Sequence, residues 1–201
     1  MNKTKNTIVL DIETSDIFGP TKRKPTDLNM SVLGVYSYVS DTYKAYTADN
    51  EKHTPFDDFW KALVDEKIER IVTYNGNHFD LPIIQKYAPE GFNILTDFES
   101  VDIMREILMT TGSRHKLDNV AKGCDIEQKS ASGLDAVKWW NEGKHEKVKE
   151  YCIQDVKVTR LLHEHCALYK SCKIWVPQYG RKIVVELKGY PDQGKQEKAN
   201  Y

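Results

Sequence analysis

The stretch IVTYNGNHFDLPII, residues 71–84, places a strand, a turn and a helix start next to one another. It opens with β-branched and aromatic residues typical of a buried strand, breaks at the Asn-Gly pair of residues 75–76, and ends in an apolar run. Asp80 lies between Phe79 and Leu81, where a core would favour an apolar side chain. An acidic residue in the first turn of a helix complements the helix dipole. That role explains a carboxylate at position 80, but not the asparagine and phenylalanine beside it.

The segments on both sides of this stretch predict an α/β fold in which one mixed β-sheet is flanked by helices. The expected strands are rich in β-branched and aromatic residues and cover 6–12, 31–40, 42–48 and 70–75, with a C-terminal hairpin at 173–177 and 181–187. The expected helices carry apolar residues at helical spacing and cover 53–70, 79–88, 101–109, 115–123, 132–142 and 145–170. Thr54 is the expected N-cap of the first helix, because Pro55 follows it at the first helical position.

Size and composition predict a single domain. The chain has 201 residues, of which 40% are hydrophobic and 29% charged, so we expect one core over residues 1–187 and a polar, flexible tail over 188–201. A net charge of −1 argues against a uniformly basic nucleic-acid coat, although it allows a local basic patch. Only three consecutive apolar residues precede Asp11, so neither a signal peptide nor a membrane anchor is expected.

The cysteines indicate reduced thiols in a cytoplasmic protein. None forms a CxxC pair, and the chain shows no export signal; they are Cys124, Cys152, Cys166 and Cys172. A zinc site could combine the last two with His163 and His165. The spacing fits no standard zinc finger, and residues 163 and 165 on a helix point to different faces, so buried free thiols are favoured.

Two further acidic stretches accompany Asp80. In IVLDIET, Asp11 and Glu13 flank one residue of a strand, so both carboxylates point to the same face of the sheet. In YCIQDV, Tyr151 and Asp155 are four residues apart on a helix, so they lie on the same helical face. Each pair alone is compatible with an ordinary solvent-exposed surface.

Taken together, these residues predict a metal site. Four carboxylates in one cleft repel one another strongly unless cations lie between them. Oxygen ligands of this kind select Mg²⁺ or Mn²⁺ over zinc. Two such ions are a known arrangement for the attack of water on a phosphodiester.

The three stretches together resemble the motifs of the DEDD (DnaQ-like) 3′–5′ exonuclease superfamily, which has a ribonuclease-H-like fold. DIET (11–14) resembles the first motif and YNGNHFD (74–80) the second. YCIQDV (151–156) resembles the third motif in its tyrosine-bearing, DEDDy form. YNGNHFDLP is also similar to the corresponding sequence in proofreading domains of B-family DNA polymerases. The segment from HKLDNVAKGCDIEQKS onward resembles stand-alone ribonuclease-H-like proteins, and the resemblance covers roughly residues 6–170.

This resemblance implies roles for five catalytic residues. Asp11, Glu13 and Asp155 are expected to hold one metal ion. Asp11 is expected also to reach a second ion, which Asp80 helps to position. Tyr151 is expected to orient the attacking water or help deprotonate it, although a free tyrosine, with a pKa near 10, is a poor base by itself.

The same resemblance implies a substrate-binding set. Asn75 and Phe79 are expected to hold or stack on the terminal nucleotides, and Ile12 and Thr14 are expected to contact the 3′ end. Lys129 stands where related stand-alone proteins often carry a lysine.

Basic clusters in two predicted loops could supply phosphate contacts. One is TKRKPT (21–26), and the other is GSRHK (112–116), which contains Arg114 and Lys116. An ordinary solvated loop is the alternative for both clusters.

The expected activity is therefore that of a two-metal 3′–5′ exonuclease that releases nucleoside 5′-monophosphates. The expected partner is a nucleic acid with a free 3′ end, with DNA favoured over RNA and a single strand over a duplex, and no membrane is involved. A polymerase or repair partner would act in trans. A structure-selective endonuclease and a catalytically silent nucleic-acid-binding module are the alternatives, since the fold alone does not determine function.

Overall fold

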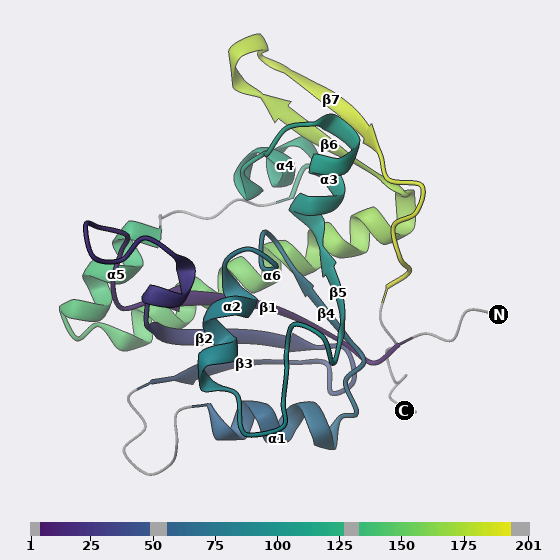
Figure 1. Ribbon diagram of the computed structural model, residues 1–201. Helices are drawn as coiled ribbons and strands as arrows, with labels where there is room; N and C mark the ends of the chain where they lie inside the picture. Colours follow the sequence, from purple (N-terminus) through teal and green to yellow (C-terminus); the bar gives the residue numbers. More distant parts are fainter. Residues whose placement is uncertain (1–4, 49–55, 127–132, 194–201) are drawn as a thin grey trace.

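The computed structural model of the chain describes residues 5–48, 56–126 and 133–193. Within this part, a sheet of five strands has the order β3-β2-β1-β4-β5 (Figure 1). The strands are β1 (Thr7–Thr14), β2 (Met30–Ser37), β3 (Thr42–Thr47), β4 (Arg70–Thr73) and β5 (Glu99–Asp102). The first three are antiparallel neighbours, whereas β4 runs parallel to β1 and β5 parallel to β4. The predicted mixed α/β sheet is confirmed.

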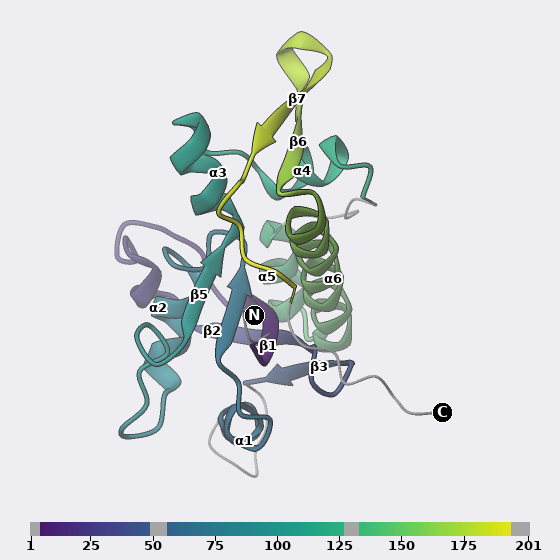
Figure 2. The ribbon, with the colours of Figure 1, turned by 90° about the vertical axis from the view of Figure 1, so that its right-hand side faces the viewer.

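Helices cover both faces of this sheet (Figures 1 and 2). They are α1 (Asp57–Asp65), α2 (Asp80–Ile84), α3 (Ile103–Thr111), α4 (Leu117–Gly123), α5 (Gly133–Asn141) and α6 (His145–Tyr169). Helices α1 and α2 pack on one face, and α6 crosses the other. Two further strands, β6 (Ser171–Val176) and β7 (Arg181–Glu186), form the expected hairpin as a separate sheet. None of the described helices is long and apolar enough to cross a membrane.

The central strand β1 is buried on both faces, and its alternation decides which side chains reach which face. Ile8, Leu10 and Ile12 pack with the residues of α1 and α2. Val9 packs on the opposite face, with residues of α6. Because side chains alternate along a strand, the residues at 11 and 13 share the face of Val9. Both carboxylates of this strand therefore lie on the side of the sheet that α6 covers.

Gly34 allows α6 to lie close to this face. It stands in β2 directly opposite Asp11. A Cβ atom at Gly34 would lie 2.8 Å from Sγ of Cys152 and 3.0 Å from Cγ2 of Val156. Helix α6 thus packs against the glycine backbone, and this close approach brings its residues 151 and 155 beside β1.

Several expected boundaries are wrong by a few residues. The strand expected at 31–40 ends at Ser37, because its hydroxyl accepts hydrogen bonds from the backbone N–H groups of residues 39 and 40 and Asp41 adopts a φ of 52°. The helix expected at 101–109 begins at Ile103, because residues 99–102 pair with β4 as a strand that the sequence did not predict. The helix expected at 79–88 is α2 followed by a short 3-10 turn, Gln85–Tyr87. The helix expected at 53–70 is α1, which begins at Asp57 with Phe56 as its N-cap, so the expected cap at Thr54 is wrong. Thr54 and Pro55 themselves lie outside the described residues.

The first part of the predicted tail is packed instead of flexible. Tyr190 is 3% exposed, and its hydroxyl lies 2.8 Å from Nδ1 of His163. Lys170 also holds this segment, through an ion pair of 2.7 Å with Asp192. The buried aromatic ring supplies the apolar contact that the polar composition of residues 188–201 concealed. Residues 194–201 lie outside the described part of the chain.

Replacing Gly34 should destabilise the fold. We expect Gly34→Val to lower the free energy of unfolding by about 2–4 kcal/mol, because the new side chain overlaps Cys152 and Val156. Gly19→Val is the matched control, because a Cβ at Gly19 meets nothing within 4 Å. Urea unfolding followed by circular dichroism measures both. Equal stability of the two variants would show that α6 does not depend on this close approach.

Candidate active site

All five predicted catalytic residues line one cleft of about 560 Å³. Asp11 and Glu13 come from β1, Asp80 is the first residue of α2, and Tyr151 and Asp155 come from α6. Asp11 is half-buried, and the side chains of the other four are at most 6% exposed. Three elements that are distant in the sequence therefore bring four carboxyl groups and one phenol to the same cavity.

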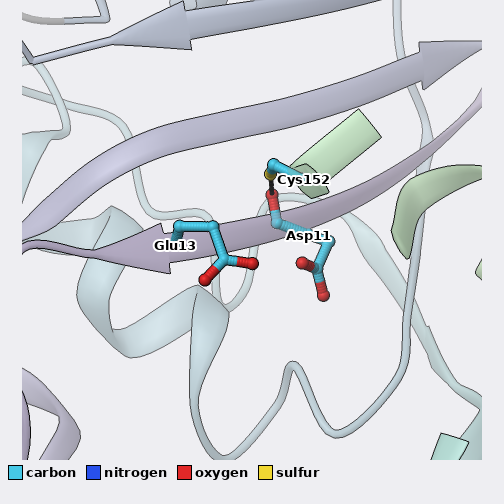
Figure 3. A group of neighbouring side chains, drawn as sticks. All are labelled: Asp11, Glu13 and Cys152. Carbon is cyan, nitrogen blue, oxygen red and sulfur yellow. Dashed lines mark hydrogen bonds between the residues drawn. The ribbon is translucent and has the colours of Figure 1, made fainter. Parts of the chain in front are cut away.

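The carboxylates of Asp11 and Glu13 are close neighbours. One oxygen of each carboxylate and Sγ of Cys152 lie within 4.8 Å of one another. The two carboxylates extend from β1, and the thiol donates a hydrogen bond of 3.4 Å to the backbone carbonyl of Asp11 (Figure 3). Burial and the charges of both acids raise the pKa of Cys152 well above its usual value. The thiol is already hydrogen-bonded to the carbonyl of Asp11, and hard divalent cations prefer oxygen ligands, so the carboxylates are the favoured donors.

Asp80 is tied to the backbone of β1. Pairing between β1 and β4 ends at Val9, so the N–H of Ile12 lies beyond the parallel ladder. Oδ1 of Asp80 accepts a hydrogen bond of 3.1 Å from this N–H. The carboxylate of Asp80 therefore accepts a hydrogen bond from a buried donor of the central strand, and this contact holds it at the cleft.

Another buried acid, Asp102, holds the turn that precedes Asp80. Its carboxylate accepts hydrogen bonds of 2.8 Å and 3.1 Å from the backbone N–H groups of Asn75 and Asn77. It also caps α3 by accepting a hydrogen bond of 3.2 Å from the backbone N–H of Arg105. Asn75 has a φ of 68°, so the turn uses the left-handed region that asparagine tolerates. Sequence reasoning missed Asp102, although an aspartate directly before an apolar helix is an N-cap signal.

Burial raises the pKa of Asp80 to about 7, and the charges of Asp102 and Asp155 add to the shift. The hydrogen bond from Ile12 opposes it, because that donor favours the ionised form. The neutral acid is thus stabilised when no cation is close. This is the electrostatic consequence of placing several carboxyl groups in one buried cavity.

Tyr151 is held in place by an aromatic neighbour. Its ring meets that of Trp139 edge-on, with centroids 6.0 Å apart. Trp139 also lies under the ammonium group of Lys147, at 3.9 Å. Helix α5 therefore supports the phenol from the side, which restricts the positions that its hydroxyl can take in the cleft.

The expected substrate-binding residues fall into two groups. Ile12, Thr14, Asn75 and Phe79 line the cleft of the carboxylates, as the resemblance implied. Arg114 and Lys116 instead line an adjoining cleft of about 420 Å³, which shares Asp11, Tyr74, Asn75 and Asp155 with the first. Lys129 lies outside the described residues.

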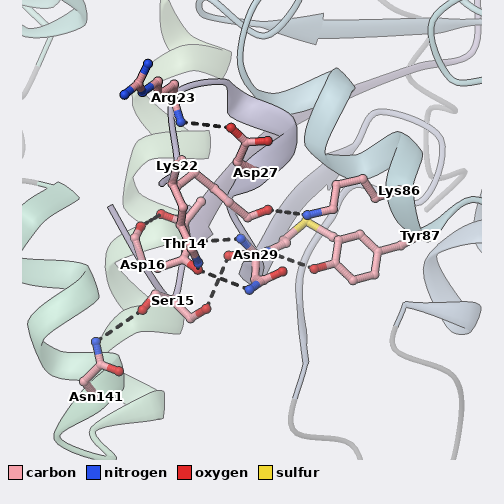
Figure 4. A network of polar contacts seen from close by, with 12 residues as sticks. Thr14, Ser15, Asp16, Lys22, Arg23, Asp27, Asn29, Lys86, Tyr87 and Asn141 are labelled. Carbon is pink, nitrogen blue, oxygen red and sulfur yellow. Dashed lines mark hydrogen bonds and ion pairs between the residues drawn. The ribbon is translucent and has the colours of Figure 1, made fainter. Parts of the chain in front are cut away.

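The loop between β1 and β2 folds onto itself beside the site (Figure 4). Lys22 forms an ion pair with Asp16, which also accepts a hydrogen bond of 3.0 Å from the N–H of Asn29. The side-chain amide of Asn141 in α5 anchors the loop by donating a hydrogen bond of 3.2 Å to the backbone carbonyl of Ser15. At least one cation of the basic cluster at 21–26 is therefore engaged within the loop itself.

The same loop brings two apolar side chains to the mouth of the cleft. Ile17 and Phe18 are 53% and 50% exposed, and both line the cavity. The ring of Phe18 meets that of Phe79 edge-on, with centroids 6.2 Å apart. Sequence reasoning did not identify them, because no periodic pattern marks residues of an irregular loop. An exposed apolar rim of this kind can contact a nucleobase or another flat ring.

The raised pKa of Asp80 predicts a pH-dependent stability of the metal-free protein. The unfolded chain releases this proton near pH 4 and the folded chain near pH 7, so stability falls as the pH rises between these values. Asp80→Asn stays neutral and should be more stable than the wild type at pH 8, by about 1–3 kcal/mol. Urea unfolding in EDTA at pH 5 and pH 8 measures the difference, with the exposed Asp65→Asn as control. Parallel pH profiles for wild type and Asp80→Asn would contradict the assignment.

Comparisons with known proteins agree with this architecture. A solved structure of the family B DNA polymerase from the hyperthermophilic archaeon Pyrobaculum calidifontis superimposes on this chain with a TM-score of 0.64 and 19% sequence identity. The match covers 82% of this chain and 25% of the polymerase chain, so the protein spans about a quarter of that polymerase. At this identity, the likeness establishes the fold alone. No curated protein matches the sequence.

The family assignment comes from the sequence. A family model described as RNase_H superfamily matches residues 8–167. This range contains the five-stranded sheet except for Thr7, the first residue of β1, together with α1 to α5 and most of α6. It also contains each of the five residues that supply carboxyl groups and the phenol to the cleft. The chain therefore belongs to the RNase H superfamily.

Proposed function

We propose that this protein is a metal-dependent 3′–5′ exonuclease of the DEDDy type that hydrolyses nucleic acid from the 3′ end and releases nucleoside 5′-monophosphates. The observation that carries the proposal is the convergence of four carboxyl groups and the phenol of Tyr151 in one cleft. Membership of the RNase H superfamily supports a nuclease activity. A single strand of DNA is the substrate we favour.

The donor set fits divalent cations. Carboxylate oxygens are hard ligands, which suit Mg²⁺ and Mn²⁺. Asp11, Glu13 and Asp155 would hold one ion, and Asp11 together with Asp80 would hold a second. The raised pKa of Asp80 supports this assignment, because a cation would offset the burial and the nearby negative charges that now favour its neutral form. Bound ions would neutralise the charge of the scissile phosphate and lower the pKa of water.

The other residues of the cleft would position the reactants. The hydroxyl of Tyr151 would orient the attacking water, since the ring is already held by Trp139. Phe79 and Ile12 would contact the last nucleoside, because both line the cavity beside the carboxylates.

We also propose the cellular setting. A polymerase or repair protein would be its partner, because the fold resembles part of a DNA polymerase. The four cysteines are free and buried, which suits a reducing cytoplasm.

The direct test uses a 5′-labelled single-stranded oligonucleotide with a free or a blocked 3′ end. In Mg²⁺ or Mn²⁺ we expect stepwise shortening of the free end alone, complete loss of cleavage in EDTA, and recovery when the metal is returned. Asp155→Asn should lower the rate by about 1,000-fold or more while binding of the oligonucleotide persists. Internal cuts would indicate an endonuclease instead, and binding without cleavage a silent module.

Tyr151→Phe isolates the phenol hydroxyl. The ring and its packing on Trp139 remain, so stability and metal binding should hardly change. We expect single-turnover cleavage to slow by about 10-fold to 1,000-fold, the range for loss of a positioning or proton-transfer group. Tyr169→Phe is the control, because Tyr169 ends the same helix and is 62% exposed. If both variants cleave at the wild-type rate, Tyr151 is only a packing residue.

A further inference from the structure

The two clefts that meet at Asp11 and Asp155 differ in their chemistry. The first cleft contains the carboxylates and the apolar rim, and no lysine or arginine is among the described residues that line it. The second contains three consecutive residues that can be cationic, Arg114, His115 and Lys116. Asp118 is the additional acidic residue of the second cleft. Among the described residues that line the two clefts, positive side chains therefore gather on one side of Asp11 and Asp155.

The basic segment is fixed to the rest of the site. Helix α3 ends at Thr111, and Gly112 turns the chain with a φ of 72°. The hydroxyl of Tyr74 then donates a hydrogen bond of 2.6 Å to the backbone carbonyl of His115. Tyr74 directly precedes Asn75 and lines both clefts. This contact places the basic segment next to the turn that leads to Asp80.

Two polar atoms of the second cleft are buried and have no hydrogen-bond partner in the described part of the chain. They are Nε2 of His115 and Oδ1 of Asn75. A buried polar atom without a partner costs about 1–3 kcal/mol, so such atoms at the wall of a cleft indicate a place for a ligand. In the tautomer with its proton on Nε2, His115 can donate to a phosphate oxygen.

The charge distribution matches the polarity of a nucleic-acid 3′ end. The last nucleoside carries no phosphate on its 3′ side, whereas the strand on its 5′ side carries one phosphate for every nucleotide. The nucleoside needs apolar contact and no cation, as the first cleft offers. The phosphates need cations, as the second cleft offers.

We infer that the second cleft binds the phosphodiester on the 5′ side of the scissile bond through Arg114, His115 and Lys116. The strand then crosses from the basic cleft to the apolar cleft, with the scissile phosphate over Asp11 and Asp155. This inference rests on the proposed exonuclease function and adds the direction of the strand. The preferred substrate is an oligonucleotide, and a mononucleotide ester lacks the groups that the basic cleft binds.

The test compares two substrates in wild type and in the double variant Arg114→Gln/Lys116→Gln. One is a single-stranded oligonucleotide, and the other is the p-nitrophenyl ester of thymidine 5′-monophosphate, which has the scissile phosphate but no nucleotide beyond it. We expect kcat/KM on the oligonucleotide to fall at least about 10-fold more than on the ester, mainly through KM. For the oligonucleotide, the slope of log KM against the logarithm of the salt concentration should be smaller in the double variant by about 1 to 1.5. This is the value for two lost phosphate contacts on a single strand.

The control Lys61→Gln/Arg181→Gln removes the same charge from exposed positions on α1 and β7. An equal loss on both substrates, or a loss no larger than that of the control, would overturn the inference. Fluorescence anisotropy with a 3′-blocked oligonucleotide gives a readout that does not need cleavage, and Kd should rise about 10-fold in Arg114→Gln/Lys116→Gln only. If the wild type cleaves neither substrate, the proposed function fails, while an unchanged Kd in the double variant refutes the strand path separately.

Discussion

The hydrogen bond from the backbone N–H of Ile12 to Oδ1 of Asp80 connects the sheet to the cleft of the carboxyl groups. Strand β1 continues past the end of its parallel partner, so this buried donor needs an acceptor that is not a strand. The start of α2 supplies it, and Asp102 holds the preceding turn in the required conformation. The same carboxylate thus completes the backbone pairing of the central strand and contributes a charge to the cleft. A shift of either β1 or the start of α2 would leave the buried N–H of Ile12 without its acceptor.

The cleft places like charges together, and packing elsewhere offsets their repulsion. Helix α6 brings Asp155 and Tyr151 to β1 because the backbone at Gly34 leaves room for Cys152 and Val156. On the other face, the side chains of Ile8, Leu10 and Ile12 are buried under α1 and α2. The apolar contacts on both faces hold β1 rigidly, so the carboxyl groups cannot separate to relax. Functional sites commonly concentrate such unfavourable interactions on a well-packed scaffold.

The sequence predicted those parts of the site that depend on local periodicity. Alternation along a strand placed Asp11 and Glu13 on one face, and helical spacing placed Tyr151 beside Asp155. The existence and type of the long elements followed from the same patterns. Three features did not follow from these patterns, because each depends on a partner distant in the sequence. They are the hydrogen bond from Asn75 to Asp102, the strand at 99–102, and the contact of Phe18 with Phe79. The two basic clusters also differ in their tertiary contacts. Lys22 of the first cluster pairs with Asp16 inside its own loop, whereas Arg114 and Lys116 of the second line a cleft.

The close packing of α6 on β2 also bears on the order in which the molecule is assembled. Strands β1, β2 and β3 are consecutive antiparallel neighbours, so their contacts join residues that are near in the sequence. Cys152 contacts Asp11 across 141 residues of chain, and closing so long a loop carries a large entropic cost before any contact repays it. The meander can therefore form early, whereas the complete cleft exists only after the last long helix has docked. An intact cleft then reports on full folding of the chain, and partial unfolding that releases α6 disrupts the cleft while much of the sheet persists.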